Sequence, residues 1–241
     1  MLFRSIHDVL RESSALNSNH APVEIIPCCV DLEPYRAAAG DAVRRRLGLE
    51  DRLVLAYAGS LGGWYMAEEM VALFCELCRL FPRAHFLVLT QSPFALIQRC
   101  FQAAGVSSDR CTVLTVEPEQ VPSYLAAADL AVSFIKPCFS KLSSSPTKVG
   151  EYLAAGLPFI ANPGIGDQDE LLREEKVGVL VEAFDPAAYR QALTRLLEML
   201  ADRTRVQARC RQVAADRYCL ERVGREGYRR VYSRLGWTPR A

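Results

Sequence analysis

The sequence of 241 residues carries almost no net charge, because 29 lysine and arginine residues face 28 aspartate and glutamate residues. A protein with this balance has no long-range field to attract nucleic acid or an anionic membrane, so no nucleic-acid partner is expected. No apolar run approaches the ~20 residues that span a bilayer, so no transmembrane segment is expected either. The chain begins with Arg4, His7 and Asp8 where a signal peptide would have an apolar stretch. These absences favour a cytoplasmic protein, with peripheral attachment to a membrane left open.

Clustered metal ligands are also missing, although the sequence has nine cysteines. Cys75 and Cys78 form a C-x-x-C pair, but they lie in a stretch with helical periodicity, and no second pair follows at a matching spacing. No clustered carboxylates stand out as ligands for a hard cation. Free cysteine behaves as a small apolar side chain, so we interpret the thiols as core residues in a reducing compartment. No metal and no cofactor are expected.

From residue 53 onward, short apolar runs alternate with longer segments of helical periodicity. The runs carry few charges, as expected for strands that are buried on both faces. They are Leu53–Ala58, Phe86–Leu89, Thr112–Leu114, Leu130–Phe134, Pro158–Ala161 and Val177–Val181. The helices predicted between them are Ala67–Leu80, Phe94–Ala103, Val121–Ala127, Pro146–Ala155 and Gln168–Arg173. This alternation requires crossover connections and predicts an α/β fold with a doubly wound, Rossmann-like parallel sheet.

The two ends of the chain differ from this alternating region. Before it, the predicted elements are a helix over Leu2–Arg11, a short strand over Val23–Pro27 and a helix over Ala37–Leu47 that ends at Gly48. After it, the predicted elements are helices over Ala187–Leu200, Arg203–Tyr218 and Leu220–Leu235. We therefore divide the chain into a leading segment, 1–51, an α/β domain, 52–200, and a helical C-terminal extension, 201–241.

The segment from Ser143 to Pro158 has the strongest local signals. Ser145 is a good helix N-cap, Pro146 suits the first helical position, and Gly156 is a natural stop. The predicted helix follows the fourth strand and its loop, so it begins at the carboxyl edge of the parallel sheet. Ligands of such sheets bind at that edge.

Two charged residues in this helix suggest a ligand. The free N–H groups and the dipole at a helix start attract phosphate, and Lys148 adds a positive charge in the first turn. Glu151, one turn further on, can accept hydrogen bonds from ribose hydroxyls. A plainer interpretation is that Lys148 and Glu151 pair with each other on the surface. The residues alone leave both interpretations open.

Two further loops reach the same edge of the predicted sheet. The segment Ala58–Tyr65 directly follows the first strand and contains Gly59, Ser60, Gly62 and Gly63. Glycines at such a turn let the backbone approach a ligand closely. The loop Asn162–Asp167 follows the fifth strand. Turns use glycine in any case, so each loop is a weak signal alone, but three loops at one edge strengthen one another.

In their order along the chain, four segments resemble landmarks of the retaining glycosyltransferases of family four, which have the GT-B fold. They are Ile25–Asp31, Tyr57–Ser60, Tyr124–Leu130 and Glu151–Pro158. The resemblance covers residues 23–235 and corresponds to the carboxyl-terminal, donor-binding half of the family. It implies that the helix start holds the donor diphosphate through Thr147 and Lys148, and that Glu151 binds the ribose.

The sequence departs from the family pattern at two places. Ser143 stands where the family has the first of two glutamates, eight positions before Glu151. The arginine and lysine that many members place after the first-strand glycine are missing, and Ser60 and Trp64 occupy that neighbourhood. The first departure affects the contact with the sugar and the second affects neutralisation of the diphosphate.

The resemblance implies the donor domain of a glycosyltransferase of the hexosyltransferase type, acting with retention of configuration. Lys148 and Glu151 are the expected catalytic residues. The expected substrate-binding residues are Gly59, Ser60, Gly62, Gly63, Ser143, Ser145, Thr147, Lys148 and Glu151. The expected partners are a nucleotide sugar and a separate polypeptide that supplies the acceptor domain. Two alternatives stay open: a non-catalytic nucleotide-sugar-binding subunit, and a sugar-nucleotide epimerase or hydrolase of GT-B architecture.

Overall fold

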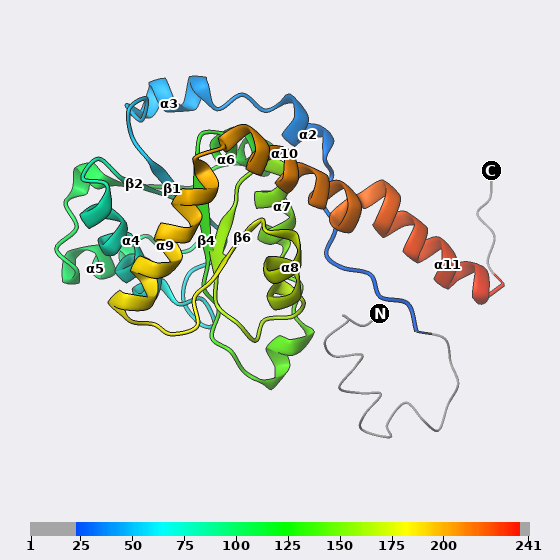
Figure 1. The fold of residues 1–241 in the computed structure, drawn as a ribbon. Coiled ribbons are helices and arrows are strands. Elements are labelled where there is room, and N and C mark those ends of the chain that lie inside the picture. Colours follow the sequence, from blue (N-terminus) through cyan, green and yellow to red (C-terminus); the bar gives the residue numbers. More distant parts are fainter. Residues whose placement is uncertain (1–22, 237–241) are drawn as a thin grey trace.

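The computed structural model describes residues 23–236, whose centre is a six-stranded parallel sheet with the strand order β3-β2-β1-β4-β5-β6 (Figure 1). The strands are β1 Val54–Ala58, β2 His85–Leu89, β3 Cys111–Leu114, β4 Leu130–Ser133, β5 Phe159–Ala161 and β6 Gly178–Leu180. This order is that of a doubly wound sheet. The predicted Rossmann-like fold and all six predicted strands are confirmed, with the ends of each strand shifted by at most one residue.

Helices cover both faces of the sheet because its strands are apolar on both sides (Figure 1). Along β1, Leu55 and Tyr57 face one layer, whereas Val54 and Ala56 face the other. The first layer contains α4 Ala67–Leu80, α5 Ala95–Ala103 and α9 Pro186–Leu200. The second contains α6 Val121–Ala126, α7 Thr147–Ala155, α8 Gln168–Glu175 and α10 Arg203–Val213. Short 3-10 turns lie at η1 Ser108–Arg110, η2 Pro118–Gln120 and η3 Phe139–Ser143.

The leading segment differs from its prediction. The helix predicted over Ala37–Leu47 begins only at Asp41, as α3 Asp41–Leu47, and a separate short helix, α2 Glu33–Ala37, precedes it, with Gly40 at the break. Gly40 lies against the end of α6, where an added Cβ would be 2.3 Å from the carbonyl oxygen of Ala126. Gly48 ends α3 in the left-handed conformation, as predicted. The strand predicted over Val23–Pro27 is not formed, and the helix predicted over Leu2–Arg11 lies outside the described residues.

The C-terminal extension is helical as predicted, but it is not two regular α-helices. After α10 the chain forms the π-helical turns η4 Ala214–Tyr218 and η5 Leu220–Arg225, and then α11 Glu226–Arg234. The cause is a parallel bridge between Val30 and Cys219, the extended residue between the two turns. Val30 N–H donates to the Tyr218 carbonyl at 2.7 Å, and Leu220 N–H donates to the Val30 carbonyl at 3.0 Å. These bonds replace helical hydrogen bonds at that point.

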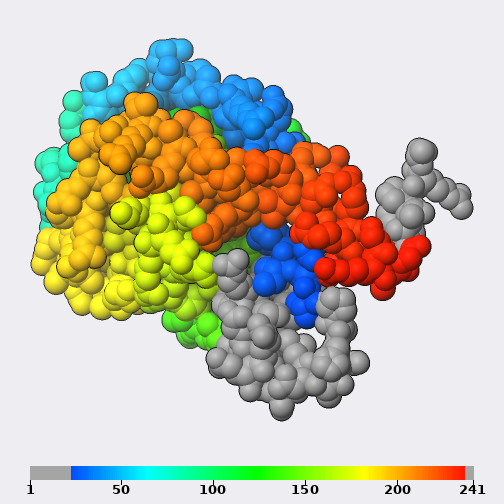
Figure 2. Space-filling view, turned by 45° about the vertical axis from the view of Figure 1, so that its right-hand side comes forward, coloured from blue at the N-terminus to red at the C-terminus, as the bar shows by residue number. Residues whose placement is uncertain are grey.

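The start of the described chain also lies beside α11, which projects from the α/β body (Figures 1 and 2). Ile26 is buried against Gly227, where an added Cβ would approach the Ile26 side chain to 2.8 Å. Glu24 accepts a hydrogen bond of 2.7 Å from Arg230. Within residues 23–236, no helix combines the length and apolarity needed to cross a bilayer.

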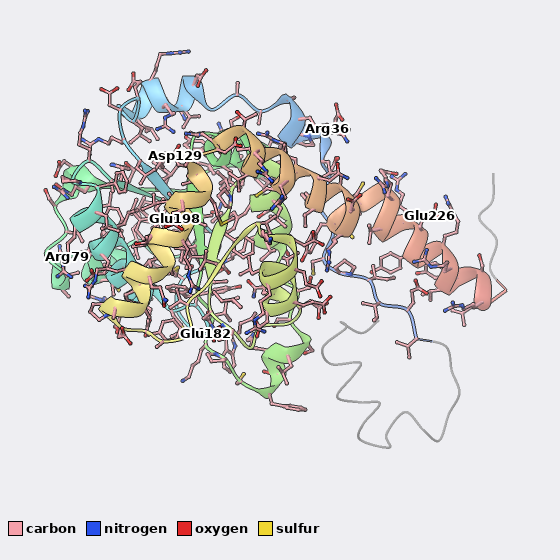
Figure 3. All side chains as sticks on the ribbon, in the orientation of Figure 1. Arg36, Arg79, Asp129, Glu182, Glu198 and Glu226 are labelled. Atoms are coloured by element: carbon pink, nitrogen blue, oxygen red, sulfur yellow. The ribbon has the colours of Figure 1, made fainter. Side chains whose placement is uncertain are left out.

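Asp129, before β4, joins the leading segment, the sheet and the C-terminal extension (Figure 3). Its carboxylate is 3% exposed and accepts a hydrogen bond of 2.7 Å from the N–H of Val54 in β1. It also forms ion pairs with Arg44 of α3, at 3.3 Å, and with Arg203 at the start of α10. A buried charge is stable only when it is paired and hydrogen-bonded in this way.

Replacing Asp129 with alanine is therefore expected to lower the free energy of unfolding by about 3 kcal/mol, because it leaves the Val54 N–H and two guanidinium groups without their shared acceptor. Urea titration monitored by circular dichroism measures the change. Asp51→Ala is the matched control, since Asp51 forms an exposed pair with Arg83 at 3.4 Å. The control should change stability by less than about 1 kcal/mol. Equal effects of the two substitutions would contradict the role given to Asp129.

Candidate functional site

A cavity of about 370 Å³ opens at the carboxyl edge of the sheet. The loop after β1 contributes Ala58, Gly59, Ser60 and Tyr65, and the end of β2 and its loop contribute Leu89, Thr90 and Gln91. The chain after β3 contributes Val116, Pro118 and Val121, and the start of α7 contributes Pro146, Thr147, Lys148 and Glu151. Segments from four crossover connections therefore converge on one cavity, as expected at the switch point between the two halves of a parallel sheet.

The start of α7 forms one wall of this cavity and carries no side-chain cap. Pro146, with extended backbone at φ −63° and ψ 117°, takes the N-cap position, and the helix begins at Thr147. The prediction that Ser145 caps this helix is therefore wrong. The Ser145 hydroxyl accepts a hydrogen bond of 3.0 Å from the N–H of Cys28 and so ties the leading segment to α7. The first N–H groups of α7 are left for a ligand or for water.

Lys148 reaches the cavity from a buried position. Its side chain is 6% exposed, and its Nζ donates a hydrogen bond of 2.9 Å to the hydroxyl of Tyr57. The same Nζ lies 4.1 Å from the ring centres of Tyr57 and Tyr65. Burial lowers the pKa of Lys148 to about 7, and the nearby Glu151 carboxylate offsets part of that shift. The interpretation of Lys148 and Glu151 as a surface pair is therefore wrong.

Glu151 lies one turn further along α7, also at the cavity wall. Burial raises the pKa of its carboxyl, against the influence of Lys148 and of the Tyr35 hydroxyl, which lies within hydrogen-bonding reach. Tyr35 comes from α2, so the leading segment contacts both ends of the site: Cys28 at Ser145 and Tyr35 at Glu151. The Glu151 carboxylate is placed to accept hydrogen bonds from hydroxyl groups in the cavity.

Some predicted site residues lie elsewhere. Gly62 and Gly63 have φ of 82° and 61° and line a separate hollow between α4 and α5. Ser143 ends η3, where its hydroxyl donates to the Ser140 carbonyl at 2.8 Å, and it does not line the cavity. The cavity thus brings together Gly59, Ser60, Thr147, Lys148 and Glu151 but leaves out Gly62, Gly63, Ser143 and Ser145.

The third predicted loop, Asn162–Asp167, supports the site's surroundings and does not line the cavity. The Asn162 side chain accepts from the Ile135 N–H at 2.8 Å and donates to the Ile135 carbonyl at 2.9 Å. Gly166, at φ 49°, donates its N–H to the Lys141 carbonyl at 2.8 Å. The loop therefore fixes the connection between β4 and α7, which carries Lys148 into place.

The site also contains residues that the sequence analysis does not assign. Tyr57 and Tyr65 enclose the Lys148 amine, Tyr35 approaches Glu151, and Thr90 and Gln91 form the opposite rim. Of these residues, only Thr90 and Gln91 could have been predicted from the sequence, because they directly follow a strand. The tyrosines are spread over three elements, and no local spacing pattern links them.

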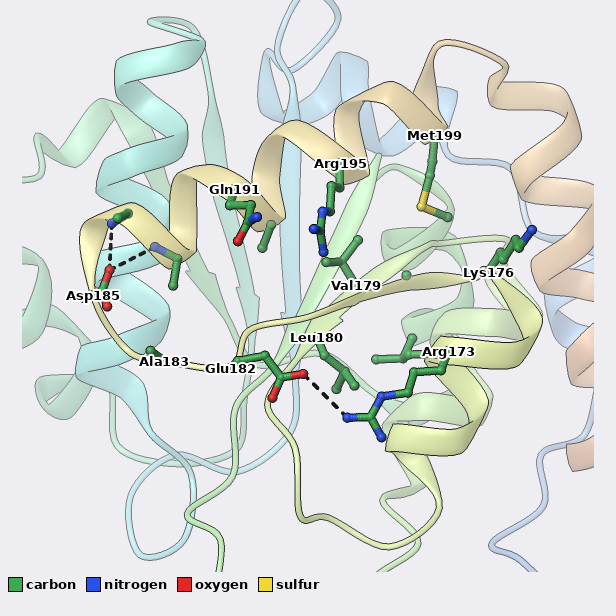
Figure 4. Close-up of a pocket in the computed structure, with 15 residues that line it drawn as sticks. Arg173, Lys176, Val179, Leu180, Glu182, Ala183, Asp185, Gln191, Arg195 and Met199 are labelled. Carbon is green, nitrogen blue, oxygen red and sulfur yellow. Dashed lines mark hydrogen bonds and ion pairs between the residues drawn. The ribbon is translucent and has the colours of Figure 1, made fainter.

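A larger cavity, about 940 Å³, runs along the edge strand β6 between α8 and α9 (Figure 4). Its two acidic side chains already have partners: Glu182 pairs with Arg173 at 3.5 Å, and Asp185 accepts from the N–H groups of Ala187 and Ala188 at 2.8 and 2.9 Å. Asp185 therefore satisfies the start of α9, the one helix that begins at this cavity. We therefore take the smaller cavity as the candidate ligand site, because an uncapped helix start and a buried lysine lie at its wall.

The cysteines are all free thiols, and each is buried or partly buried. Cys75 and Cys78 lie on α4, and burial raises the pKa of both thiols. Across the described part of the chain, no group of three or more His, Cys, Asp or Glu side chains could hold a metal ion.

Solved structures similar to this chain include glycosyltransferases. WaaG, a glycosyltransferase involved in lipopolysaccharide biosynthesis, has a TM-score of 0.70 at 18% identity, over 90% of this chain and 59% of WaaG. Anabaena HepE in complex with UDP and glucose has a TM-score of 0.69 at 16% identity, over 87% of this chain and 57% of HepE. The fold is accordingly of the GT-B type, and the chain spans less than two thirds of each of these proteins.

A curated relative is also a glycosyltransferase. The D-inositol 3-phosphate glycosyltransferase of Nocardioides sp. is 27% identical over 204 residues, which cover 77% of this chain and 43% of the relative. The family model of the glycosyl transferases group 1 matches residues 52–199, more than half of the chain. This chain therefore belongs to the group 1 family of glycosyl transferases.

Proposed function

We propose that this chain is the donor domain of a retaining, hexosyltransferase-type glycosyltransferase of family four and binds a nucleoside diphosphate sugar. The observation that carries the proposal is the cavity at the sheet edge, whose wall combines the uncapped start of α7 with a buried lysine and a carboxylate one turn later. Diphosphate suits the helix start and Lys148, and ribose suits Glu151. Similar structures support this proposal, because Anabaena HepE was solved in complex with UDP and glucose and in complex with UDP-glucose.

Each group has a distinct role in the proposed reaction. The N–H groups of Thr147 and Lys148 and the Lys148 amine hold the diphosphate, whose negative charge grows as the bond to the sugar breaks. Gly59 and Ser60 allow the backbone after β1 to approach the ligand, and Glu151 fixes the ribose. Backbone dipoles and one cation stabilise the departing diphosphate, so the proposed transfer uses no metal and no cofactor.

The acceptor is proposed to bind to a domain outside this sequence, either in a longer chain or in a second polypeptide. The chain spans 59% of WaaG, 57% of HepE and 43% of the curated relative. A second candidate is a non-catalytic nucleotide-sugar-binding subunit. Ser143 favours it, because the serine replaces the family's first glutamate and its hydroxyl is bonded to the Ser140 carbonyl. One similar structure is a GtfA/B complex, with a TM-score of 0.69.

Replacing Lys148 with alanine should weaken binding of UDP by roughly tenfold to a hundredfold, because one charge-assisted contact is worth about 1.5–3 kcal/mol. Binding of uridine should change little, since uridine has no phosphate. Glu151→Ala should weaken uridine and UDP alike, because its proposed partner is the ribose. Isothermal titration of the parent and both variants with uridine and UDP measures these differences. Titration of the parent with GDP and ADP shows whether the site accepts other bases.

Lys141→Ala is the matched control for the loss of a lysine. Lys141 stacks over Trp64, 4.8 Å from its ring centre, and does not line the cavity, so its removal should leave UDP binding unchanged. Unchanged UDP and uridine binding in both Lys148→Ala and Glu151→Ala would remove the site assignment.

The purified chain is expected to bind UDP-glucose without transferring glucose, because the acceptor wall lies outside this sequence. Incubation with UDP-glucose and a panel of sugar and lipid acceptors, followed by mass spectrometry, tests this expectation. Transfer by the chain alone would contradict the proposal that the acceptor binds to a domain outside this sequence. Release of free glucose would instead favour the hydrolase alternative.

A further inference from the structure

The amine of Lys148 sits in a clamp of two tyrosines, Tyr57 from β1 and Tyr65 from the loop that follows it. The two rings meet edge to face, with centres 6.5 Å apart, and each ring centre lies 4.1 Å from Nζ. The contact with a ring favours a cation, but both rings and the Tyr57 hydroxyl, which accepts a hydrogen bond from Nζ, carry no charge. Tyr57 and Tyr65 therefore fix the position of the Lys148 amine and occupy the space that water molecules would otherwise fill.

The clamp is anchored on the other side by the backbone. The Tyr57 hydroxyl accepts from Lys148 and donates to the carbonyl of Ser60, so one hydroxyl fixes the amine and the turn after β1 together. Gly59 completes the wall: an added Cβ there would lie 2.8 Å from Nζ. The position of the amine is thus set by three neighbouring parts of the β1 turn.

Within the part of the chain that the structure describes, the Lys148 amine forms no ion pair. Among residues 23–236, no carboxylate lies within ion-pair distance of Nζ. The titratable groups that face it are Tyr57 and Tyr65, together with Glu151 and Tyr152 of its own helix, and Tyr35 stands behind Glu151. Tyr152 is occupied elsewhere, because its hydroxyl accepts from the Ala58 N–H at 2.9 Å and donates to the Val132 carbonyl. Burial outweighs Glu151 and brings the pKa of Lys148 to about 7.

We propose that Tyr57 and Tyr65 are positioning residues that hold Lys148 as a desolvated amine at the cavity wall, and that a nucleoside diphosphate binds with uptake of one proton by this amine. The inference rests on the proposed function. The proton comes from solvent and adds to the lone pair of Nζ, so the cation forms where the diphosphate oxygens arrive. No covalent bond of the protein or the ligand changes in this step.

The direction in which pH changes UDP affinity follows from the protonated and the neutral state of the Lys148 amine. With a pKa of about 7 in the free protein, Lys148 is about half protonated at pH 7 and mostly neutral at pH 8. A bound diphosphate raises that pKa, so the complex holds more protons than the free protein above pH 7. UDP affinity should consequently fall roughly fivefold from pH 7 to pH 8, while proton uptake rises from about half a proton to nearly one. The terminal phosphate of UDP, which titrates near pH 6, contributes little in this range.

Isothermal titration of the chain with UDP, in Hepes and in Tris at pH 7 and pH 8, measures the uptake because the two buffers have different ionisation enthalpies. Lys148→Met should abolish both the uptake and the fall in affinity. Tyr65→Leu removes one ring and lets water reach the amine, so uptake at pH 8 should drop well below one proton. Tyr65→Phe keeps the ring and is the matched control, with uptake preserved.

Tyr57→Phe tests the other half of the clamp. It keeps the ring but removes the hydrogen-bond acceptor, so the free amine holds its proton less firmly, and uptake at pH 7 should rise while UDP affinity falls about threefold to tenfold. Uridine, which carries no phosphate, should bind all variants without proton uptake.

The outcomes separate this inference from the proposed function. If none of UDP, GDP and ADP binds the parent chain, the proposed function is wrong. If UDP binds with the same affinity at pH 7 and pH 8 and without proton uptake, only the clamp inference is wrong. Equal uptake in the parent and in Tyr65→Leu would likewise overturn the role given to Tyr65.

Discussion

The site depends on one constraint, the burial of the Lys148 amine beside the turn after β1. The amine is 6% exposed and rests on Tyr57, Tyr65 and the backbone of Gly59. A side chain at Gly59 would meet the amine, so the turn that lets a ligand approach is also the turn that lets the lysine enter. The position of α7 relative to β1 and the shape of the cavity are thus set by the same contact.

The leading segment and the C-terminal extension stabilise this arrangement from outside the sheet. Cys28 binds Ser145 before α7, Val30 pairs with Cys219, and Asp129 links α3, β1 and α10. Helix α10 also packs on α7, and Arg211 donates to the Ala155 carbonyl near the end of that helix at 3.3 Å. Residues on both sides of the α/β domain therefore hold the helix that carries Lys148 and Glu151.

Features that depend on local sequence patterns could be predicted from the sequence, whereas features that depend on distant partners could not. Apolar runs located all six strands within one residue, and a positive-φ glycine ended α7 at Gly156 as expected. Ser145 was predicted to cap α7 because an N-cap side chain bonds to an N–H group two or three residues ahead. In the structure its hydroxyl accepts instead from the N–H of Cys28, 117 residues away. The π-helical turns arise from the pairing of Cys219 with Val30, which is even further away along the chain. Side-chain spacing placed Lys148 in the first turn of α7 but could not show that two tyrosines from another segment enclose it.

Under the proposed function, burial also accounts for how a site with few cations can hold a diphosphate. The family's arginine and lysine after the first-strand glycine are missing here, and the described lining of the cavity contains a single cationic side chain, Lys148. Two unit charges 4 Å apart attract by ~1 kcal/mol in water but by ~4 kcal/mol at an effective dielectric constant of 20, a typical value near a protein surface. One partly desolvated cation can thus attract the diphosphate as strongly as several hydrated cations. The same desolvation penalises the charge when no anion is bound, which is why burial lowers the pKa of Lys148.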